Sequence, residues 1–217
     1  MKRLGNIYED ICDLENLEVA FGKVQRGKAF RPDVAAYRSK LSDNLQEVRG
    51  ALVSGNYALG HYHAFKVFEP KERIIHAAPV RERVIHHAIV NVCGDSLERG
   101  LIDDCFACRK GKGQWAAIAR AQEFARRHPL CLKLDIKSYF DSIDHGILMD
   151  VLRRKFKDAR LLNLLEALVG SYSTAPGKGF PIGNLTSQYF ANLYLDRFDR
   201  LASCVKSRDY VRHMDDC

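Results

Sequence analysis

The sequence predicts an α+β fold in which helices surround short antiparallel strands. Many segments place apolar residues at the 3.6-residue spacing of helices, while a few stretches alternate with the period of two that is typical of strands. The chain has 217 residues, of which 47% are hydrophobic, so it can form one large or two small domains with a substantial core. No internal repeat or low-complexity tract interrupts it.

The expected elements can be placed along the chain from these patterns. Helices are expected from about residue 7 to residue 59, where Leu45, Val48, Leu52 and Val53 form one apolar stripe. There follow strands over 61–70 and 71–80, a helix over 81–99, a helix over 113–129, a strand over 131–137, a helix begun by 141–144, a helix over 158–171, a Gly/Pro loop over 177–188, a long helix over 187–205 and a strand over 208–217.

Charge and cysteine content narrow the class of protein. There are 34 Lys and Arg against 27 Asp and Glu, a net charge of +7, which favours an anionic partner. No stretch reaches the ~18 uncharged apolar residues of a membrane span, and acids interrupt the N-terminal apolar run, so we expect neither a membrane segment nor a signal peptide. Seven scattered cysteines, an odd number, fit reduced thiols in a cytoplasmic protein.

Three aspartates indicate a metal site. Asp135 lies within the strand expected over 131–137, and Asp215 and Asp216 end another strand about eighty residues later. An adjacent pair of carboxylates is costly unless a cation neutralises it, and oxygen ligands without histidine suit Mg²⁺. Two Mg²⁺ ions bridged by carboxylates activate a hydroxyl and stabilise a leaving pyrophosphate, which is the chemistry of nucleotidyl transfer.

Five motifs give the chain a family resemblance. "LKLDIKSYFDSIDH", "GFPIGNLTSQYFANLYL" and "YVRHMDD" resemble three successive motifs of reverse transcriptases, in that family's order and spacing. "EPKERIIHAAPVRERVIHHAI" and "CFACRKGKGQWAAIARA" resemble the two finger motifs that precede them. Gln188, where many relatives have proline, and "ACRKGKG" are similar to the reverse transcriptases of diversity-generating retroelements.

This resemblance implies the fingers and partial palm of a right-hand polymerase, with an antiparallel palm sheet backed by helices. Residues 1–60 would form an N-terminal helical extension, 61–130 the fingers, and 131–217 the partial palm with a fingers insertion over about 150–182. The sequence ends one residue after the Asp pair, so the thumb is expected to be absent. A chain of this extent is expected to bind RNA weakly and to extend no primer alone.

Residue roles follow from the resemblance, position by position. Asp135, Asp215 and Asp216 match the catalytic, metal-binding acids, and Ile136 would lend its backbone carbonyl to the metal. Phe140 matches the aromatic gate that excludes a ribose 2′-hydroxyl. The predicted dNTP-binding residues are Lys71, Arg73, Arg109, Phe140, Pro181, Ile182 and Gly183, and Ser187 and Gln188 would cap or line the following helix. Tyr139 is expected in the core.

The implied function is RNA-directed DNA synthesis from dNTPs with Mg²⁺ as cofactor. The resemblance implies a template RNA, a cDNA or primer and a small basic accessory protein as partners, and no membrane. Ile182 replaces a glutamine of accurate relatives, so copying is expected to be error-prone. An intron-type or defence-associated reverse transcriptase, or a non-catalytic nucleic-acid-binding remnant, remains an alternative.

Several other polar, cysteine and aromatic residues are expected to have structural roles, not catalytic or metal-binding ones. Asp141 and Asp144 fit a helix cap. Cys105 and Cys108 have zinc-ligand spacing, but no second pair completes a site. Trp115 is expected in the core, because a lone helical tryptophan is more often packed than exposed.

Overall fold

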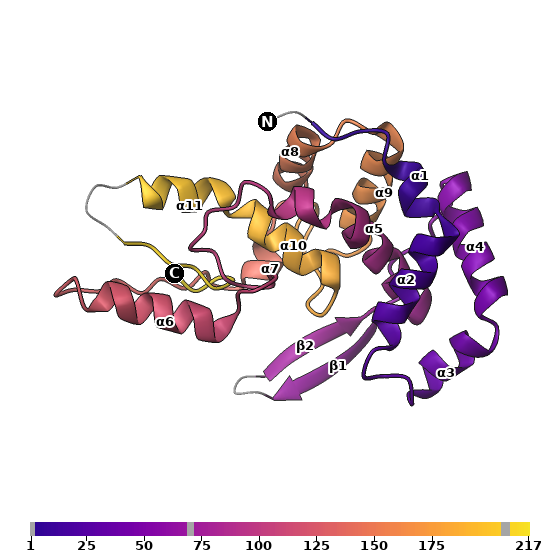
Figure 1. Ribbon diagram of the computed structural model, residues 1–217, viewed down its shortest axis with the longest axis horizontal. Coiled ribbons are helices and arrows are strands. Elements are labelled where there is room, and N and C mark those ends of the chain that lie inside the picture. Colours follow the sequence, from indigo (N-terminus) through magenta and orange to yellow (C-terminus); the bar gives the residue numbers. More distant parts are fainter. Residues whose placement is uncertain (1–2, 69–71, 205–208) are drawn as a thin grey trace.

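The computed structural model describes residues 3–68, 72–204 and 209–217, in which helices outweigh a single antiparallel hairpin. In chain order the elements are α1 (Tyr8–Cys12), α2 (Leu14–Gln25), α3 (Pro32–Ser39), α4 (Leu41–Ser54), β1 (His63–Phe68), β2 (Glu72–Ala77), α5 (Val80–Glu98), α6 (Gln114–Ala125), α7 (Tyr139–Ser142), α8 (His145–Lys155), α9 (Ala159–Gly170), α10 (Leu185–Tyr194) and α11 (Asp196–Ser203). Helices α1–α4 lie on one side of α5, and α6, α11 and the C-terminal segment lie on the other (Figure 1). The division into fingers and palm stays a prediction.

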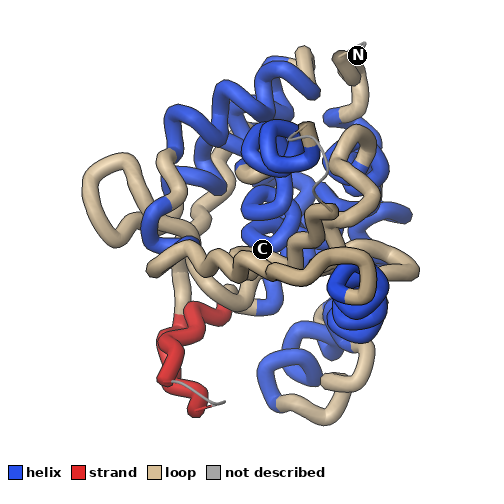
Figure 2. Tube along the Cα trace, turned by 90° about the vertical axis from the view of Figure 1, so that its left-hand side faces the viewer, coloured by secondary structure: helices blue, strands red, loops and turns tan. Residues whose placement is uncertain are grey.

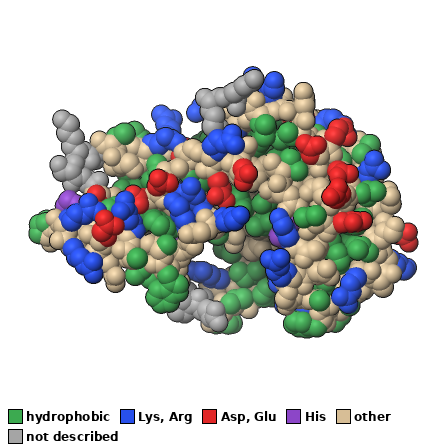
Figure 3. Space-filling model, viewed as in Figure 1, with side chains coloured by type: hydrophobic (Ala, Val, Ile, Leu, Met, Phe, Trp, Pro, Cys, Tyr) green, Lys and Arg blue, Asp and Glu red, His purple; other side chains and the backbone are tan. Residues whose placement is uncertain are grey.

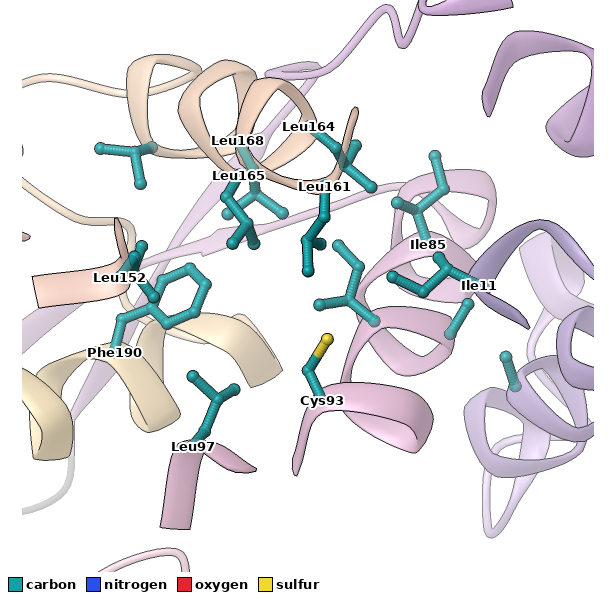
Figure 4. Close-up of a cluster of buried hydrophobic side chains, with 14 of the residues drawn as sticks. Ile11, Ile85, Cys93, Leu97, Leu152, Leu161, Leu164, Leu165, Leu168 and Phe190 are labelled. Carbon is teal, nitrogen blue, oxygen red and sulfur yellow. The ribbon is translucent and has the colours of Figure 1, made fainter. Parts of the chain in front are cut away.

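The core is built around α5. Val84, Ile85, Ala88 and Ile89 have no exposed surface, as their helical spacing predicts. Helix α5 packs most extensively against α2 and α10, and the leucines of α9 project toward the same cluster (Figure 4). Truncating one such buried leucine to alanine costs about 2–5 kcal/mol, so this cluster carries much of the stability. No helix among the described residues is both long and apolar enough to cross a membrane.

The predicted strand pair around residues 69–72 is confirmed as a hairpin. Strands β1 and β2 pair antiparallel, with His63 opposite Ala77 and Phe68 opposite Glu72. The hairpin projects from the helical body (Figure 2). Lys71, a predicted nucleotide-binding residue, lies outside the described residues.

Neither of the strands predicted over 131–137 and 208–217 is present as a regular strand within the described residues, so the predicted palm sheet is not formed there. Asp135 instead meets Asp216 through an isolated antiparallel bridge, and Leu134 exchanges both backbone hydrogen bonds with Cys217 at 2.9 Å. The side chains of Leu132 and Leu134 are 73% and 43% exposed. Alternation buries one face only where a second layer packs on it, and no described helix covers these leucines.

Two apolar residues expected to be buried are also exposed. Trp115 is 84% exposed and Val53 is 52% exposed, so both predictions were wrong. Helix α6 is attached to the body through ion pairs such as Arg120 Nε to Asp104 Oδ1 at 2.7 Å, and Trp115 lies away from them near its start. Helical spacing alone does not show whether a neighbouring element covers a given face.

The cap predicted at Asp141 and Asp144 is confirmed for Asp144 alone. Asp144 is the N-cap of α8, and its carboxylate accepts a hydrogen bond from the Ile147 amide at 3.0 Å, whereas Asp141 lies within α7. The long helix expected over 187–205 is wrong, because the chain turns at Leu195 and divides it into α10 and α11. Helix α11 contacts the C-terminal segment through the hydrogen bond from the Tyr210 hydroxyl to Asp199.

A buried histidine joins the core helix to α10. His86 on α5 is 3% exposed, and its Nδ1 lies 2.7 Å from the hydroxyl oxygen of Thr186. Burial, followed by the charge of His87, lowers the pKa of His86 from 6.5 to about 4. The folded state therefore keeps this imidazole neutral.

We expect acid to destabilise the fold through His86. A folded pKa below the unfolded one gives stability that is complete above pH 6.5 and is lost as the pH falls toward 4. The free energy of unfolding should fall by about 2 kcal/mol between pH 7.5 and pH 5 from this group alone. Urea denaturation at both pH values measures it. His86→Gln should show a smaller pH dependence, and an equal dependence in both proteins would contradict the assignment.

Candidate functional site

The Asp215–Asp216 pair lies on a tight backbone turn. The His213 amide donates to the Asp216 carbonyl at 2.9 Å, and the Asp216 amide donates to the His213 carbonyl at 3.3 Å. Met214 has a φ of +62°, a left-handed conformation that two-residue hairpin turns require and that non-glycine residues seldom adopt. Asp215 therefore lies at the tip of a strained turn held by two reciprocal hydrogen bonds.

This turn lies beside Asp135. Asp135 pairs with Asp216, and the Ile136 amide donates to the Asp215 carbonyl at 3.3 Å. In Figure 1 the yellow C-terminal segment runs between α11 and α6 toward α7, the helix that begins four residues after Asp135. The fold thus brings the backbone of Asp135 beside those of Asp215 and Asp216, which follow about eighty residues later in the sequence.

A lysine shares the site with these acids. Lys133 Nζ lies 3.0 Å from Asp216 Oδ1, and both side chains are at least half exposed to solvent. The hydrogen bond and charge of Asp216, with a smaller effect from Asp135, raise the pKa of Lys133. The sequence offered a signal for this lysine, since Lys133 lies two residues before the first acid.

The carboxylates are suitable ligands for a hard cation, but their side chains do not converge on one metal position. Asp135, Asp215 and the Ile136 carbonyl offer the oxygen ligands that Mg²⁺ prefers. Among the described residues, no group of three or more His, Cys, Asp or Glu side chains converges on one point. The remaining ligands would be backbone carbonyls, waters and phosphate oxygens, as is usual for Mg²⁺.

The aromatic pair after the first acid divides between core and site. Tyr139 is buried, and its hydroxyl donates to the Ala191 carbonyl at 2.5 Å, which confirms the core prediction. Burial raises its pKa. Phe140 is half-buried, and its carbonyl accepts a hydrogen bond from the Phe180 amide at 2.8 Å. The predicted gate residue therefore lies against the Gly/Pro loop.

The Gly/Pro loop packs against the base of the hairpin. The Ile182 carbonyl accepts a hydrogen bond from the His76 amide of β2 at 2.9 Å, and Pro181 is buried. Gly183 has a φ of +113°, and a Cβ atom there would lie 2.8 Å from Ile75 Cγ2. Only glycine fits this close approach without strain, so the loop and hairpin are positioned together.

Ser187 and Gln188 lie in the first turn of α10. The N-cap is Asn184, so of the two roles expected for Ser187 and Gln188, capping the helix or lining it, the first does not hold and the second remains. Ser187 is 1% exposed and Gln188 is half-buried. Both line the helix, and they lie inside rather than on an open surface.

The predicted triphosphate-binding cations are in different environments. Arg73 lies on β2 opposite Val67 and is exposed. Arg109 instead donates to the carbonyls of Ile102 and Cys105 at 2.7 and 2.9 Å, and its side chain is only 11% exposed. Arg109 thus stabilises its own loop, whereas Arg73 is accessible to a ligand.

The surface shown in Figure 3 carries mixed charges and, among the described residues, no single basic patch. Figure 3 shows Lys and Arg side chains interspersed with acidic ones, on a face that is hollowed between α6 and the hairpin.

The cysteine pair Cys105 and Cys108 does not add a metal site, because Cys105 is buried with its thiol 3.5 Å from Asn192 Oδ1 while Cys108 is exposed. All seven cysteines are free thiols.

Two residues that the sequence did not single out belong to this region. Lys133 contacts Asp216, and Arg212 is fully buried directly behind the acidic turn. Arg212 had a weak signal in the sequence, since it is a cation within an otherwise strand-like stretch that leads to the acids.

Comparison with known proteins shows the fold and distant relatives. No protein-family model matches the chain. A chain of a solved structure titled "Partial Cas6-RT-Cas1--Cas2 complex" aligns with 97% of this chain at a TM-score of 0.60 and 19% identity, covering 37% of that chain. A second structure, the "Cas6-RT-Cas1--Cas2 complex", gives the same score and identity and covers 23% of its chain. The protein therefore shares the fold of the aligned region of each of these two chains.

Three curated proteins are similar in sequence. Protein YkfC of Escherichia coli (strain K12) is 26% identical over 179 residues, 75% of this chain and 46% of YkfC. An "Uncharacterized 91 kDa protein in cob intron" of Schizosaccharomyces pombe is 39% identical over 83 residues, 35% of this chain and 10% of that protein. The "Putative COX1/OXI3 intron 2 protein" of Saccharomyces cerevisiae is 23% identical over 148 residues, covering 65% and 16% respectively. The chain spans less than half the length of each.

We expect Lys133 to compete with a cation for the acids. Lys133→Met removes the ammonium from Asp216 and should tighten Mn²⁺ binding a few-fold at low ionic strength, with less effect in high salt. Electron paramagnetic resonance of free Mn²⁺ measures the affinity. Lys137→Met is the matched control, because it removes the same charge from an exposed lysine that makes no ion pair with a described residue. Equal changes in both variants would reduce the effect to net charge and contradict a specific role for Lys133.

Proposed function

We propose that this chain is the catalytic segment of a reverse transcriptase, an RNA-directed DNA polymerase that transfers nucleotides from dNTPs. The observation that carries the proposal is the turn bearing Asp215 and Asp216 set against Asp135. Two further findings support it: the fold likeness to chains of complexes whose titles include RT, and the relatives named for introns. The whole protein's activity is part of this proposal, since the chain spans only part of its relatives.

In this proposal the acids and their neighbours hold the reacting groups. Asp135, Asp215 and the Ile136 carbonyl would hold Mg²⁺, with Asp216 as the third acid. Bound Mg²⁺ supplies activation of the primer 3′-hydroxyl and charge stabilisation of the leaving pyrophosphate. Arg73 would grip the triphosphate, as a guanidinium fork suits phosphate oxygens.

The loop from Phe180 to Asn184 would shape the nucleotide pocket. The Phe180 amide donates to the Phe140 carbonyl and the Ile182 carbonyl accepts from the His76 amide, so the loop joins the proposed sugar gate to the hairpin, which supports a shared nucleotide pocket. Phe140 would exclude a 2′-hydroxyl by its ring. Ile182, which has no amide to offer the nascent base pair, would permit error-prone copying.

The type of genetic element that encodes the protein is a further part of the proposal. Gln188 and the "ACRKGKG" motif favour a diversity-generating retroelement, with a small basic accessory protein and a template RNA as partners. The intron names of two relatives favour an intron-type enzyme instead. The structural neighbours come from complexes whose titles name Cas proteins, so a defence-associated reverse transcriptase with a protein partner is a third candidate. A non-catalytic RNA-binding module would bind RNA without incorporating nucleotides.

Asp135→Asn and Asp215→Asn should each abolish DNA synthesis and spare RNA binding. Each change removes a charged metal ligand, and a loss of about a thousandfold or more corresponds to several kcal/mol of transition-state stabilisation. Primer extension on an RNA template, with the polypeptide as expressed from its gene, measures the rate. Asp150→Asn, on the exposed surface of α8, is the control. Variants within tenfold of the parent would exclude the proposed metal ligands.

Phe140→Ala should admit ribonucleotides, because the proposed gate acts by steric exclusion of one hydroxyl. The ratio of kcat/KM for dNTP over rNTP should fall by about ten- to a hundredfold, the usual scale of discrimination by packing. Competition between the two substrates in primer extension measures it. Phe198→Ala, at a half-exposed position on α11, controls for the loss of an aromatic ring. An unchanged ratio would remove Phe140 as the gate.

A further inference from the structure

Arg212 forms a buried ion pair directly behind the acidic turn. Its Nε and Nη2 atoms lie 2.7 Å from Oδ1 and Oδ2 of Asp199 on α11, and both side chains are fully buried. A buried charge is very costly without a partner, whereas a two-point pair with further hydrogen bonds satisfies it. The guanidinium plane is therefore fixed by geometry that allows little freedom.

The remaining donors of Arg212 contact the turn and α10. Nη1 donates to the Met214 carbonyl at 2.7 Å and to Asn192 Oδ1 at 3.1 Å, and Nη2 donates to the Asn192 carbonyl at 3.2 Å. Met214 carries the positive φ, and its carbonyl belongs to the peptide that leads into Asp215. Arg212 thus fixes the orientation of the peptide unit that immediately precedes this acid.

The ion pair is anchored on other sides as well. The Arg212 amide donates to the Asp104 carbonyl at 2.8 Å, and the Arg212 carbonyl accepts from the Phe106 amide at 2.9 Å. The Tyr210 hydroxyl donates to Asp199 Oδ1 at 2.7 Å. The turn is consequently tied to α10, α11 and the loop after α5 through one guanidinium and its backbone.

We propose that Arg212 is a positioning residue that holds the Asp215 turn beside Asp135 by fixing the Met214 carbonyl from the interior. This inference rests on the proposed function, because it assigns Arg212 to the site in which Asp135 and Asp215 hold the cation. The role demands arginine. A lysine ammonium cannot pair with both Asp199 oxygens and reach the Met214 carbonyl and Asn192 at the same time.

Arg212→Lys tests the proposal with the metal as probe. We expect Mn²⁺ affinity, measured by electron paramagnetic resonance, to fall at least tenfold, and the amide of Asp216 to exchange with deuterium at least tenfold faster. Amides of α5 should keep their protection. In primer extension kcat should fall while the KM for dNTP changes little, because Arg212 does not touch the nucleotide. Leu164→Ala is the control, since it opens a cavity beneath α9, which lies apart from the C-terminal segment in Figure 1. It should lower the melting temperature and leave Mn²⁺ affinity unchanged.

The outcomes separate this inference from the proposed function. If the parent and Asp215→Asn bind Mn²⁺ equally, the metal site itself is absent and both fail. If the parent binds Mn²⁺ through Asp215 but Arg212→Lys retains its affinity and turn protection, only the positioning role is overturned. If Arg212→Lys does not fold, Asp199→Asn removes the paired charge at constant shape and takes its place. Loss of α5 protection in both variants would also overturn the inference, because Arg212 would then stabilise the whole fold and not the turn.

Discussion

The burial of α5 is the constraint on which the rest of the structure depends. A 19-residue helix with about half of its residues buried requires neighbours on several sides, and α2 and α10 supply most of the packing, with α1, α3 and α4 adding to it. Because α10 is fixed against α5, partly by the hydrogen bond between His86 and Thr186, it can serve as a rigid support. Asn192 on α10 then contacts Arg212, so the acidic turn is positioned from the core outward.

Two ion pairs at the site differ in what they can do. Arg212 and Asp199 are fully buried and multiply bonded, so separating them leaves an uncompensated charge. Lys133 and Asp216 are exposed and joined by one contact, which solvent and salt screen. The first pair suits a permanent support for the turn, and the second suits a contact that an arriving cation can replace.

The hairpin and the Gly/Pro loop form a second assembled unit. Gly183 allows the loop to approach Ile75, and the backbone bond between Ile182 and His76 fixes their register. The same loop contacts the segment after Asp135 through Phe180 and Phe140. Residues proposed to bind metal, sugar and triphosphate therefore belong to segments joined by main-chain hydrogen bonds, which change little with side-chain identity.

Residue chemistry singled out three acids as candidate metal ligands, and that role stays a prediction. The sequence by itself determined the helices with strong periodicity, the hairpin and the cap at Asp144, because these depend on local spacing. It could not show that Leu132, Leu134 and Trp115 lie exposed, since burial depends on whether another layer covers a face. Only the tertiary structure decided that Arg109 bonds its own loop, that Lys133 contacts Asp216 and that Arg212 pairs with Asp199. The Arg212–Asp199 pair joins segments that no local pattern relates, and the cost of burying a charge selects the partner only once the chain has folded.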